Sequence, residues 1–126
     1  MANLVDTCGC IEWLADGPLA ASFESALLDP ASLVVPTCLQ FELYQWVKRE
    51  RDESMTLEAI ALAERAQVVP LTTGTALEVG DLALEHGLSF ADALTYATAR
   101  HHGAVLVTCD AHSAELEGVR YHSKQA

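Results

Sequence analysis

The chain has few positive charges, with seven lysine and arginine residues against 18 aspartate and glutamate residues in 126 positions. Its net charge of −11 excludes a protein that holds nucleic acid on a broad basic surface, because the phosphate backbone is bound mainly through lysine and arginine. Any contact with nucleic acid must therefore be local. The acidic balance also favours a basic protein partner.

A long apolar run is missing as well. A transmembrane helix needs about 18 or more consecutive apolar residues, and the sequence has no such stretch. The first residues reach an acid at Asp6 without the basic segment and hydrophobic stretch that are typical of a signal peptide. Together these absences predict a cytoplasmic protein with no membrane partner.

The four cysteines, Cys8, Cys10, Cys38 and Cys109, lack the paired spacing of most zinc sites. Cys8 and Cys10 are too close in sequence to pair comfortably with each other, and thiols stay reduced in the cytoplasm. We therefore expect four reduced, buried thiols. A zinc site that uses Cys8 and Cys10 is the less favoured alternative.

Short strand-like runs alternate with helical patterns along the chain. Strands are expected at 3–5, 32–35 and 104–107, with short ones at 67–70 and 119–121, and helices at 7–14, 18–28, 37–52, 54–66, 72–86 and 89–103. Expected caps are Thr37, Ser54 or Thr56, Thr72 or Thr73, and Ser89. Strands separated by helices of this length require crossover connections and a parallel sheet. The prediction is a single α/β domain over residues 1–126, with a central parallel sheet between two layers of helices.

Four acids, Asp6, Glu42, Asp92 and Asp110, fall where a predicted strand ends or a predicted helix begins. In a parallel α/β sheet such positions line one crevice, at the carboxyl ends of the strands. Carboxylates gathered there repel one another unless a hard cation such as Mg²⁺ or Mn²⁺ lies among them. The sequence therefore predicts a metal site made by all four acids.

Each acid also has an ordinary explanation. Asp6 and Asp110 are placed as helix caps, and Asp92 completes a capping box with Ser89. Glu42 lies on the flank of a helix face that should bury Leu39, Leu43 and Trp46, where it could extend to solvent or pair with an arginine. Taken singly these explanations are favoured, but four independent caps should scatter over both edges of the sheet, so the set favours a metal site.

The neighbouring polar residues are assigned smaller roles. Thr7 and Thr108 are expected to cap helices rather than to orient a water molecule. His112 is expected to be a solvated loop histidine rather than a phosphate contact, and Glu115 is a candidate acid at the margin of the site. Phosphatases of the haloacid dehalogenase type need a second aspartate where Cys8 stands, and response-regulator receivers need paired early acids, so both classes are disfavoured.

Four segments in order along the chain carry a resemblance: Val5-Asp6-Thr7-Cys8-Gly9, Phe41-Glu42-Leu43, the run from Leu88 to Leu94, and the run from Leu106 to His112. This ordered set resembles a PIN-domain ribonuclease of the VapC toxin family and spans nearly the whole chain. Ser113 departs from the pattern, because many relatives carry an aromatic residue there.

The resemblance implies a PIN-like fold and a Mg²⁺- or Mn²⁺-dependent endoribonuclease that is the toxin of a type II toxin–antitoxin pair. A metal-activated water, held by Asp6, Glu42, Asp92 and Asp110, would cleave an RNA phosphodiester. A cognate antitoxin, an RNA substrate and a second copy of the chain are the implied partners. The alternative is a catalytically inactive PIN-like module that binds RNA or protein.

Overall fold

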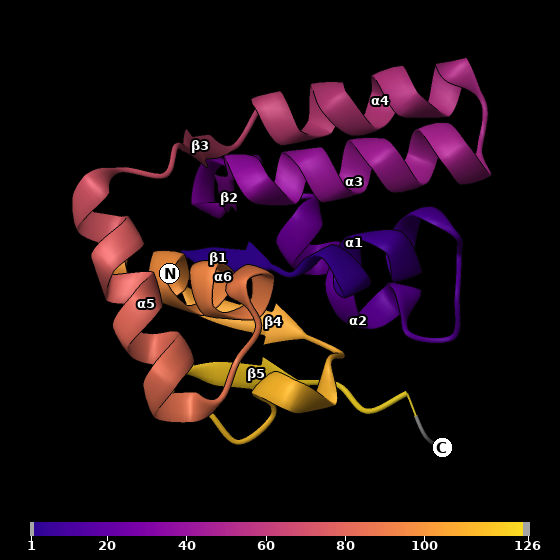
Figure 1. Cartoon of the computed structure of the whole chain (residues 1–126). Coiled ribbons are helices and arrows are strands. Elements are labelled where there is room, and N and C mark those ends of the chain that lie inside the picture. The colour runs from indigo at the N-terminus through magenta and orange to yellow at the C-terminus, as the bar shows by residue number, and fades with distance from the viewer. Residues whose placement is uncertain (1, 125–126) are drawn as a thin grey trace.

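The computed structural model describes residues 2–124 and shows an α/β protein in which short strands alternate with helices (Figure 1). The strands are β1 (Asn3–Val5), β2 (Val34–Pro36), β3 (Gln67–Val69), β4 (Val105–Thr108) and β5 (Val119–Tyr121). The α-helices are α1 (Thr7–Leu14), α2 (Ala20–Leu27), α3 (Thr37–Glu50), α4 (Glu53–Glu64), α5 (Thr73–His86) and α6 (Phe90–His101). Two single-turn 3₁₀ helices, η1 (Pro30–Ser32) and η2 (Ala111–Ser113), complete the fold.

Every strand pairing is parallel. Strand β4 lies between β1 and β5, and β2 pairs with β3. A parallel bridge between Asn3 and Leu33 joins the two sets at the start of β1, which gives the strand order β3, β2, β1, β4, β5. The chain therefore moves outward from β1 in two opposite directions, and the boundary between β1 and β4 is the topological switch point where α/β proteins place their sites.

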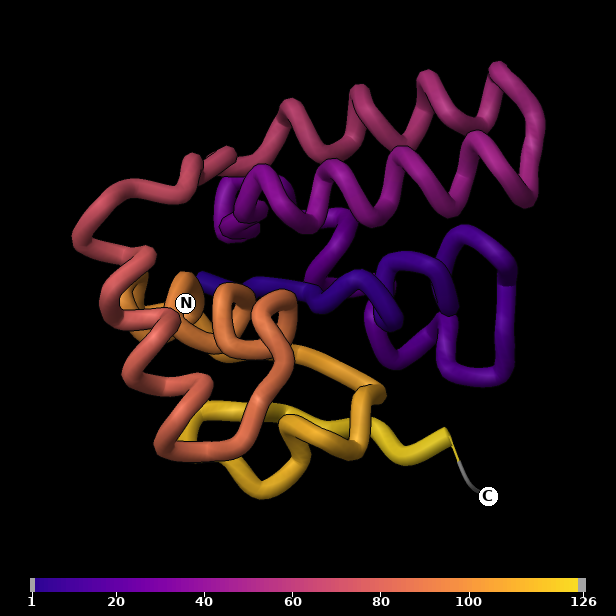
Figure 2. The backbone as a smooth tube through the Cα atoms, in the orientation of Figure 1, coloured from indigo at the N-terminus to yellow at the C-terminus, as the bar shows by residue number. Residues whose placement is uncertain are grey.

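Helices cover both faces of the sheet, as the sequence predicts. The connections from β1 to β2 to β3 run in one direction across the sheet, and the connection from β3 back to β4 runs in the other. Because such crossovers are right-handed as a rule, α1 to α4 are expected over one face and α5 and α6 over the opposite face. Figure 2 follows this path along the backbone.

The core is packed around the two central strands. Leu4 of β1 and Leu106 of β4 are fully buried, together with Phe23 of α2. Gly9 of α1 makes this packing possible, since a Cβ atom there would lie 2.7 Å from the Phe23 ring and 2.9 Å from Val5. Helix α1 is thereby held close to β1, and the residue that joins them, Asp6, has little freedom to move.

Helix α6 packs closely for a related reason. Its residues from Ala93 to Ala99 are all buried, and small alanines at 93, 97 and 99 let the helix approach both the sheet and α5. Gly87, with a φ of 65°, ends α5 in a left-handed conformation that favours glycine. The short link that follows brings Ser89 to the start of α6.

Two expected helix caps are wrong by one or a few residues. Helix α4 is capped by Asp52, whose side chain accepts from the Met55 amide, rather than by Ser54 or Thr56. Aspartate is as good a cap as serine, and Asp52 comes first where the chain leaves extended backbone. Helix α3 begins at Thr37 itself, with Pro36 in the cap position and no side-chain cap.

No helix in residues 2–124 combines the length and apolar character needed to cross a membrane.

Candidate metal centre

Asp6 lies directly after β1 and is almost fully buried, with 9% of its surface exposed. Its Oδ1 accepts a hydrogen bond from the Thr7 amide at 2.8 Å, which makes it the cap of α1. Its Oδ2 accepts from the Thr108 hydroxyl at 3.0 Å. Both carboxylate oxygens are therefore held in place by residues on either side of the switch point.

Asp110 occupies the matching position after β4. Its amide donates to the Thr108 hydroxyl oxygen at 2.9 Å, and its Oδ1 accepts from the His112 amide at 3.0 Å, which caps η2. The His112 Nδ1 lies 3.1 Å from the same Oδ1, although the imidazole is largely exposed. Thr108 is thus the shared contact that couples Asp110 to Asp6.

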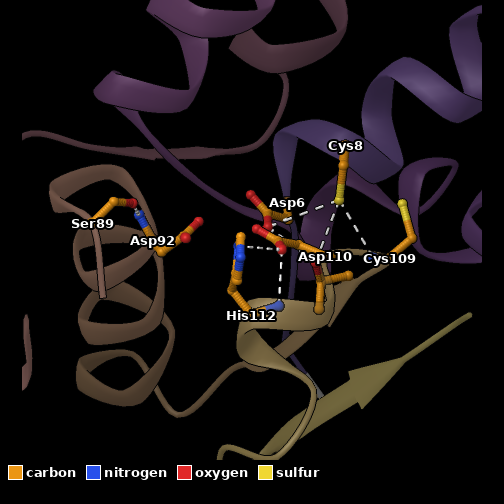
Figure 3. Close-up of polar contacts among 8 residues, drawn as sticks. Asp6, Cys8, Ser89, Asp92, Cys109, Asp110 and His112 are labelled. Carbon is orange, nitrogen blue, oxygen red and sulfur yellow. Dashed lines mark hydrogen bonds and ion pairs between the residues drawn. The ribbon is translucent and has the colours of Figure 1, made fainter. Parts of the chain in front are cut away.

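Asp92 enters the site from the first turn of α6. The Ser89 hydroxyl caps this helix by accepting from the Asp92 amide at 3.3 Å. The Asp92 carboxylate points toward Asp110 and Asp6 (Figure 3), and a hydrogen bond with the Ser89 side chain lowers its pKa against the raising effects of burial and Asp110. The cap and the site therefore use different atoms of the same residue.

Glu42 reaches the site from the second turn of α3. Its Oε1 accepts a hydrogen bond from the Thr7 hydroxyl at 2.9 Å, so the side chain is directed to the start of α1. The buried face of α3 is formed by Leu39, Leu43 and Val47, whereas the expected member Trp46 is only partly buried. Of the two interpretations open for Glu42, solvation or participation in the site, the contact with Thr7 favours the second.

All four acids line one open cavity of about 130 Å³, together with Thr7, Cys8 and Ala91. The sequence predicted this convergence from strand ends and helix starts. Glu115 is exposed and is not among the residues that line the cavity, and its role as an outer acid stays a prediction.

The surroundings of the cavity disfavour the negatively charged forms of its carboxyl groups. Burial raises the pKa of Asp6 from its ordinary 3.8 to about 6, and the negative charges of Asp92 and Asp110 raise it further against the lowering effect of the Thr7 and Thr108 hydrogen bonds. Burial also raises the pKa of Asp92, and repulsion from Asp110 adds to this effect. Two carboxyls of one small cavity therefore resist ionisation in the metal-free protein.

These donors fit a hard divalent cation. The acids offer oxygen ligands, which Mg²⁺ and Mn²⁺ prefer, and a bound cation would relieve the repulsion that raises both pKa values. Ligand atoms of Asp92, Asp110 and His112 already lie within 4.8 Å of one another. Asp6 and Glu42 line the same cavity and are the further oxygen donors within it.

Three polar neighbours have roles that the sequence reading missed. Thr7 and Thr108 do not cap helices with their hydroxyl groups but hold Glu42 and Asp6. His112 is solvated as expected, yet its Nδ1 also contacts Asp110. The two hydroxyl contacts depend on how α1 packs against α3 and β4, so local sequence signals do not reveal them.

The cysteines are all free thiols, as expected, but only Cys10 and Cys109 are buried. Cys8 and Cys38 are partly exposed, so the expectation of four buried thiols is wrong. Cys8 cannot be buried because it stands in the first turn of α1, where it forms part of the wall of the acidic cavity.

The chain is therefore an α/β protein whose parallel sheet carries a carboxylate-lined cavity at its switch point. The chain belongs to the PIN domain family, whose model matches residues 4–119. No curated protein sequence matches it.

Solved structures share the fold at low sequence identity. A toxin–antitoxin complex from Klebsiella pneumoniae is 20% identical, with a TM-score of 0.81 over 97% of this chain and 99% of that one. The DNA-bound VapBC of Salmonella typhimurium is 19% identical, with a TM-score of 0.73 over 98% of each chain. VapC20 of Mycobacterium tuberculosis, a toxin that cleaves the sarcin–ricin loop, is 17% identical, with a TM-score of 0.68 over 85% of this chain and 87% of that one.

Proposed function

We propose that the chain is a single-domain, metal-dependent endoribonuclease and acts as the toxin of a type II toxin–antitoxin pair. The observation that carries the proposal is the convergence of Asp6, Glu42, Asp92 and Asp110 on one cavity at the switch point of a PIN fold. The toxin and VapBC structures that share the fold support it.

The four carboxylates are proposed to hold Mg²⁺ or Mn²⁺. Such a cation, when bound, supplies Lewis acidity that activates water and stabilises the oxygen leaving an RNA phosphodiester. The chain's own residues prepare the site, since Thr108 fixes the Asp6 carboxylate and Thr7 fixes Glu42. The His112 imidazole, which is largely exposed and contacts Asp110 Oδ1, is proposed to donate a hydrogen bond to a phosphate oxygen.

The proposed protein partner is a basic antitoxin. Its arginine would enter the acidic cavity and compete with metal and RNA through charge-assisted hydrogen bonds. An apolar hollow of about 300 Å³ between α3 and α4, where Phe41 and Tyr44 are exposed, offers surface for the rest of such a partner. A homodimer is proposed from the family resemblance alone.

RNA cleavage tests the enzymatic part of the proposal. We expect the purified chain to cleave a pool of structured RNAs with Mg²⁺ or Mn²⁺ and to stop when a chelator is added. Asp6→Asn should reduce cleavage by about three orders of magnitude, because a metal contributes several kcal/mol to such transition states. Metal-dependent RNA binding without cleavage would instead support the inactive PIN-like module.

A co-purification experiment tests the antitoxin. The product of a neighbouring small gene, coexpressed with this chain, should bind it and suppress RNA cleavage. Phe41→Ala should weaken this complex without changing the cleavage rate of the free chain, because Phe41 does not line the acidic cavity. Cleavage that no neighbouring gene product suppresses would contradict the toxin assignment while leaving the nuclease assignment in place.

A further inference from the structure

Two cysteines from opposite ends of the chain meet at the wall of the acidic cavity. Cys8 follows Asp6 at the start of α1, and Cys109 lies between Thr108 and Asp110 at the end of β4. The Cys8 Sγ accepts a hydrogen bond from the Cys109 amide at 3.3 Å, across 101 residues of sequence. Figure 3 shows this contact between the two cysteines beside Asp6 and Asp110.

The two thiols differ in their burial. Burial raises the pKa of Cys109 to about 12, and a side-chain hydrogen bond with Cys8 contributes to the rise. Cys8 is partly exposed and lines the cavity, whereas Cys109 is only 5% exposed. One thiol is therefore accessible to a small oxidant from the cavity, and the second is held behind it.

We propose that Cys8 and Cys109 form a reversible disulfide when the protein meets a peroxide. Hydrogen peroxide transfers one oxygen to the Cys8 sulfur, which gives a sulfenic acid and one water molecule. The Cys109 sulfur then displaces that oxygen as a second water molecule, and the sulfur–sulfur bond forms. Two thiols are oxidised and one peroxide is reduced, and a dithiol reductant reverses the change.

The disulfide would act on the acidic site through Thr108. The Cys8 Sγ lies 3.4 Å from the Thr108 hydroxyl and 3.9 Å from the Asp6 Oδ2. A bond of about 2.05 Å to the Cys109 sulfur changes the position of the Cys8 side chain relative to both groups. It also ties the segments that carry Asp6 and Asp110, so the positions of both carboxylates change.

Peptide mapping tests the disulfide without reference to any activity. The full-length chain is treated with hydrogen peroxide, alkylated without reductant and cleaved after glutamate, which places Cys8 and Cys10 in residues 1–12, Cys38 in 25–42 and Cys109 in 86–115. We expect residues 1–12 linked to 86–115, with fragmentation locating the bond at Cys8 rather than Cys10. The Cys38→Ser variant, which removes the other partly exposed thiol, should give the same linked peptide.

Absence of the linked peptide in the wild-type chain, or its formation through Cys10 or Cys38, would overturn the proposal. The Cys109→Ala variant should lose the link and accumulate sulfenic or higher acids at Cys8, detected by a dimedone-type probe. No variant is needed for the decisive result, so a folding defect in Cys109→Ala cannot obscure it.

RNA cleavage tests the regulatory consequence, and this arm rests on the proposed nuclease function. Oxidation should lower the cleavage rate on the order of tenfold, as changes to groups that orient metal ligands do, and dithiothreitol should restore it. Cys38→Ser should respond like the wild-type chain. A linked peptide with unchanged cleavage would overturn the regulatory role, and a chain that forms the link but never cleaves RNA would contradict the proposed function alone.

Discussion

The acidic cavity has two sides that are built differently. On the strand side, Asp6 and Asp110 follow β1 and β4, and their carboxylates and backbones are held by Thr7, Thr108 and His112. On the helix side, Glu42 accepts a single hydrogen bond from Thr7, and the Asp92 carboxylate extends from the first turn of α6 toward the other acids (Figure 3). The strand side is fixed by the fold, while the helix side depends on the longer side chain of Glu42 and on an aspartate that extends from the first turn of a helix.

Because of this difference, the strand side should mainly affect the stability of the protein and the helix side its binding of metal. A buried carboxylate with two fixed partners carries a large desolvation cost and contributes to the folding energetics directly. A carboxylate on a helix surface can reorient at low cost when a cation enters. We therefore expect changes on the strand side to alter the metal-free protein, and changes on the helix side to alter mainly its response to metal.

The largest expected effect is the pH dependence caused by Asp6. Its folded pKa of about 6 exceeds the ordinary 3.8, so between these values the folded state binds more protons than the unfolded state, and stability falls as pH rises. The loss is complete above about pH 6 and amounts to roughly 3 kcal/mol. Urea unfolding of the metal-free chain from pH 4 to 7.5 measures it.

The Asp6→Asn variant provides the control for this prediction. Without an ionisable group at position 6, the decline in unfolding free energy between pH 4 and 6 should be much smaller. If unfolding free energy depends on pH equally in the variant and the wild-type chain, Asp6 is not the titrating group and its burial does not lower the stability.

The next effect concerns Asp92 and the metal. At 100 times its dissociation constant, Mn²⁺ should stabilise the wild-type chain by about 2.7 kcal/mol. Asp92→Asn should abolish this gain, while the metal-free stability is held or raised because repulsion from Asp110 is removed. Ser89 keeps its cap in the variant, since it bonds the Asp92 amide.

Asp81→Asn on the exposed surface of α5 is the matched control and should keep the full Mn²⁺ response. If Asp92 served only as a helix cap, its variant would lose roughly 1 kcal/mol with and without metal. Thermal unfolding followed by circular dichroism distinguishes the two outcomes.

Thr108→Val should destabilise the metal-free chain by about 2 kcal/mol, because it leaves the Asp110 amide without its partner and the buried Asp6 Oδ2 with only the long Cys8 thiol contact. Thr98→Val is the matched control. Thr98 is equally buried, but its hydroxyl bonds the Leu94 carbonyl within α6, and that carbonyl keeps its helical partner. Similar losses in the two variants, measured by urea unfolding, would contradict the special role of Thr108.

The sequence predicts the positions of the acids better than the hydrogen bonds that hold them. Asp6 and Asp110 are found because apolar strand runs precede them, and Asp92 because Ser89 marks a helix start. Thr7 and Thr108 were misassigned as caps, since their hydroxyl contacts join segments 35 and 102 residues apart. Periodicity and cap signals act within one or two turns, whereas these contacts follow from the packing of α1 against α3 and β4.

The smallest expected change in stability belongs to Glu42, on the helix side. Glu42→Gln keeps an oxygen that accepts from the Thr7 hydroxyl, so unfolding free energy should change by less than about 0.5 kcal/mol. The loss of charge should still weaken Mn²⁺ binding roughly tenfold, as measured by titration calorimetry. Glu64→Gln on α4 is the matched control, because Glu64 also accepts one side-chain hydrogen bond, from Gln40, outside the cavity. An unchanged Mn²⁺ affinity in Glu42→Gln would remove Glu42 from the ligand set and leave Asp92 as the only functional acid on that side.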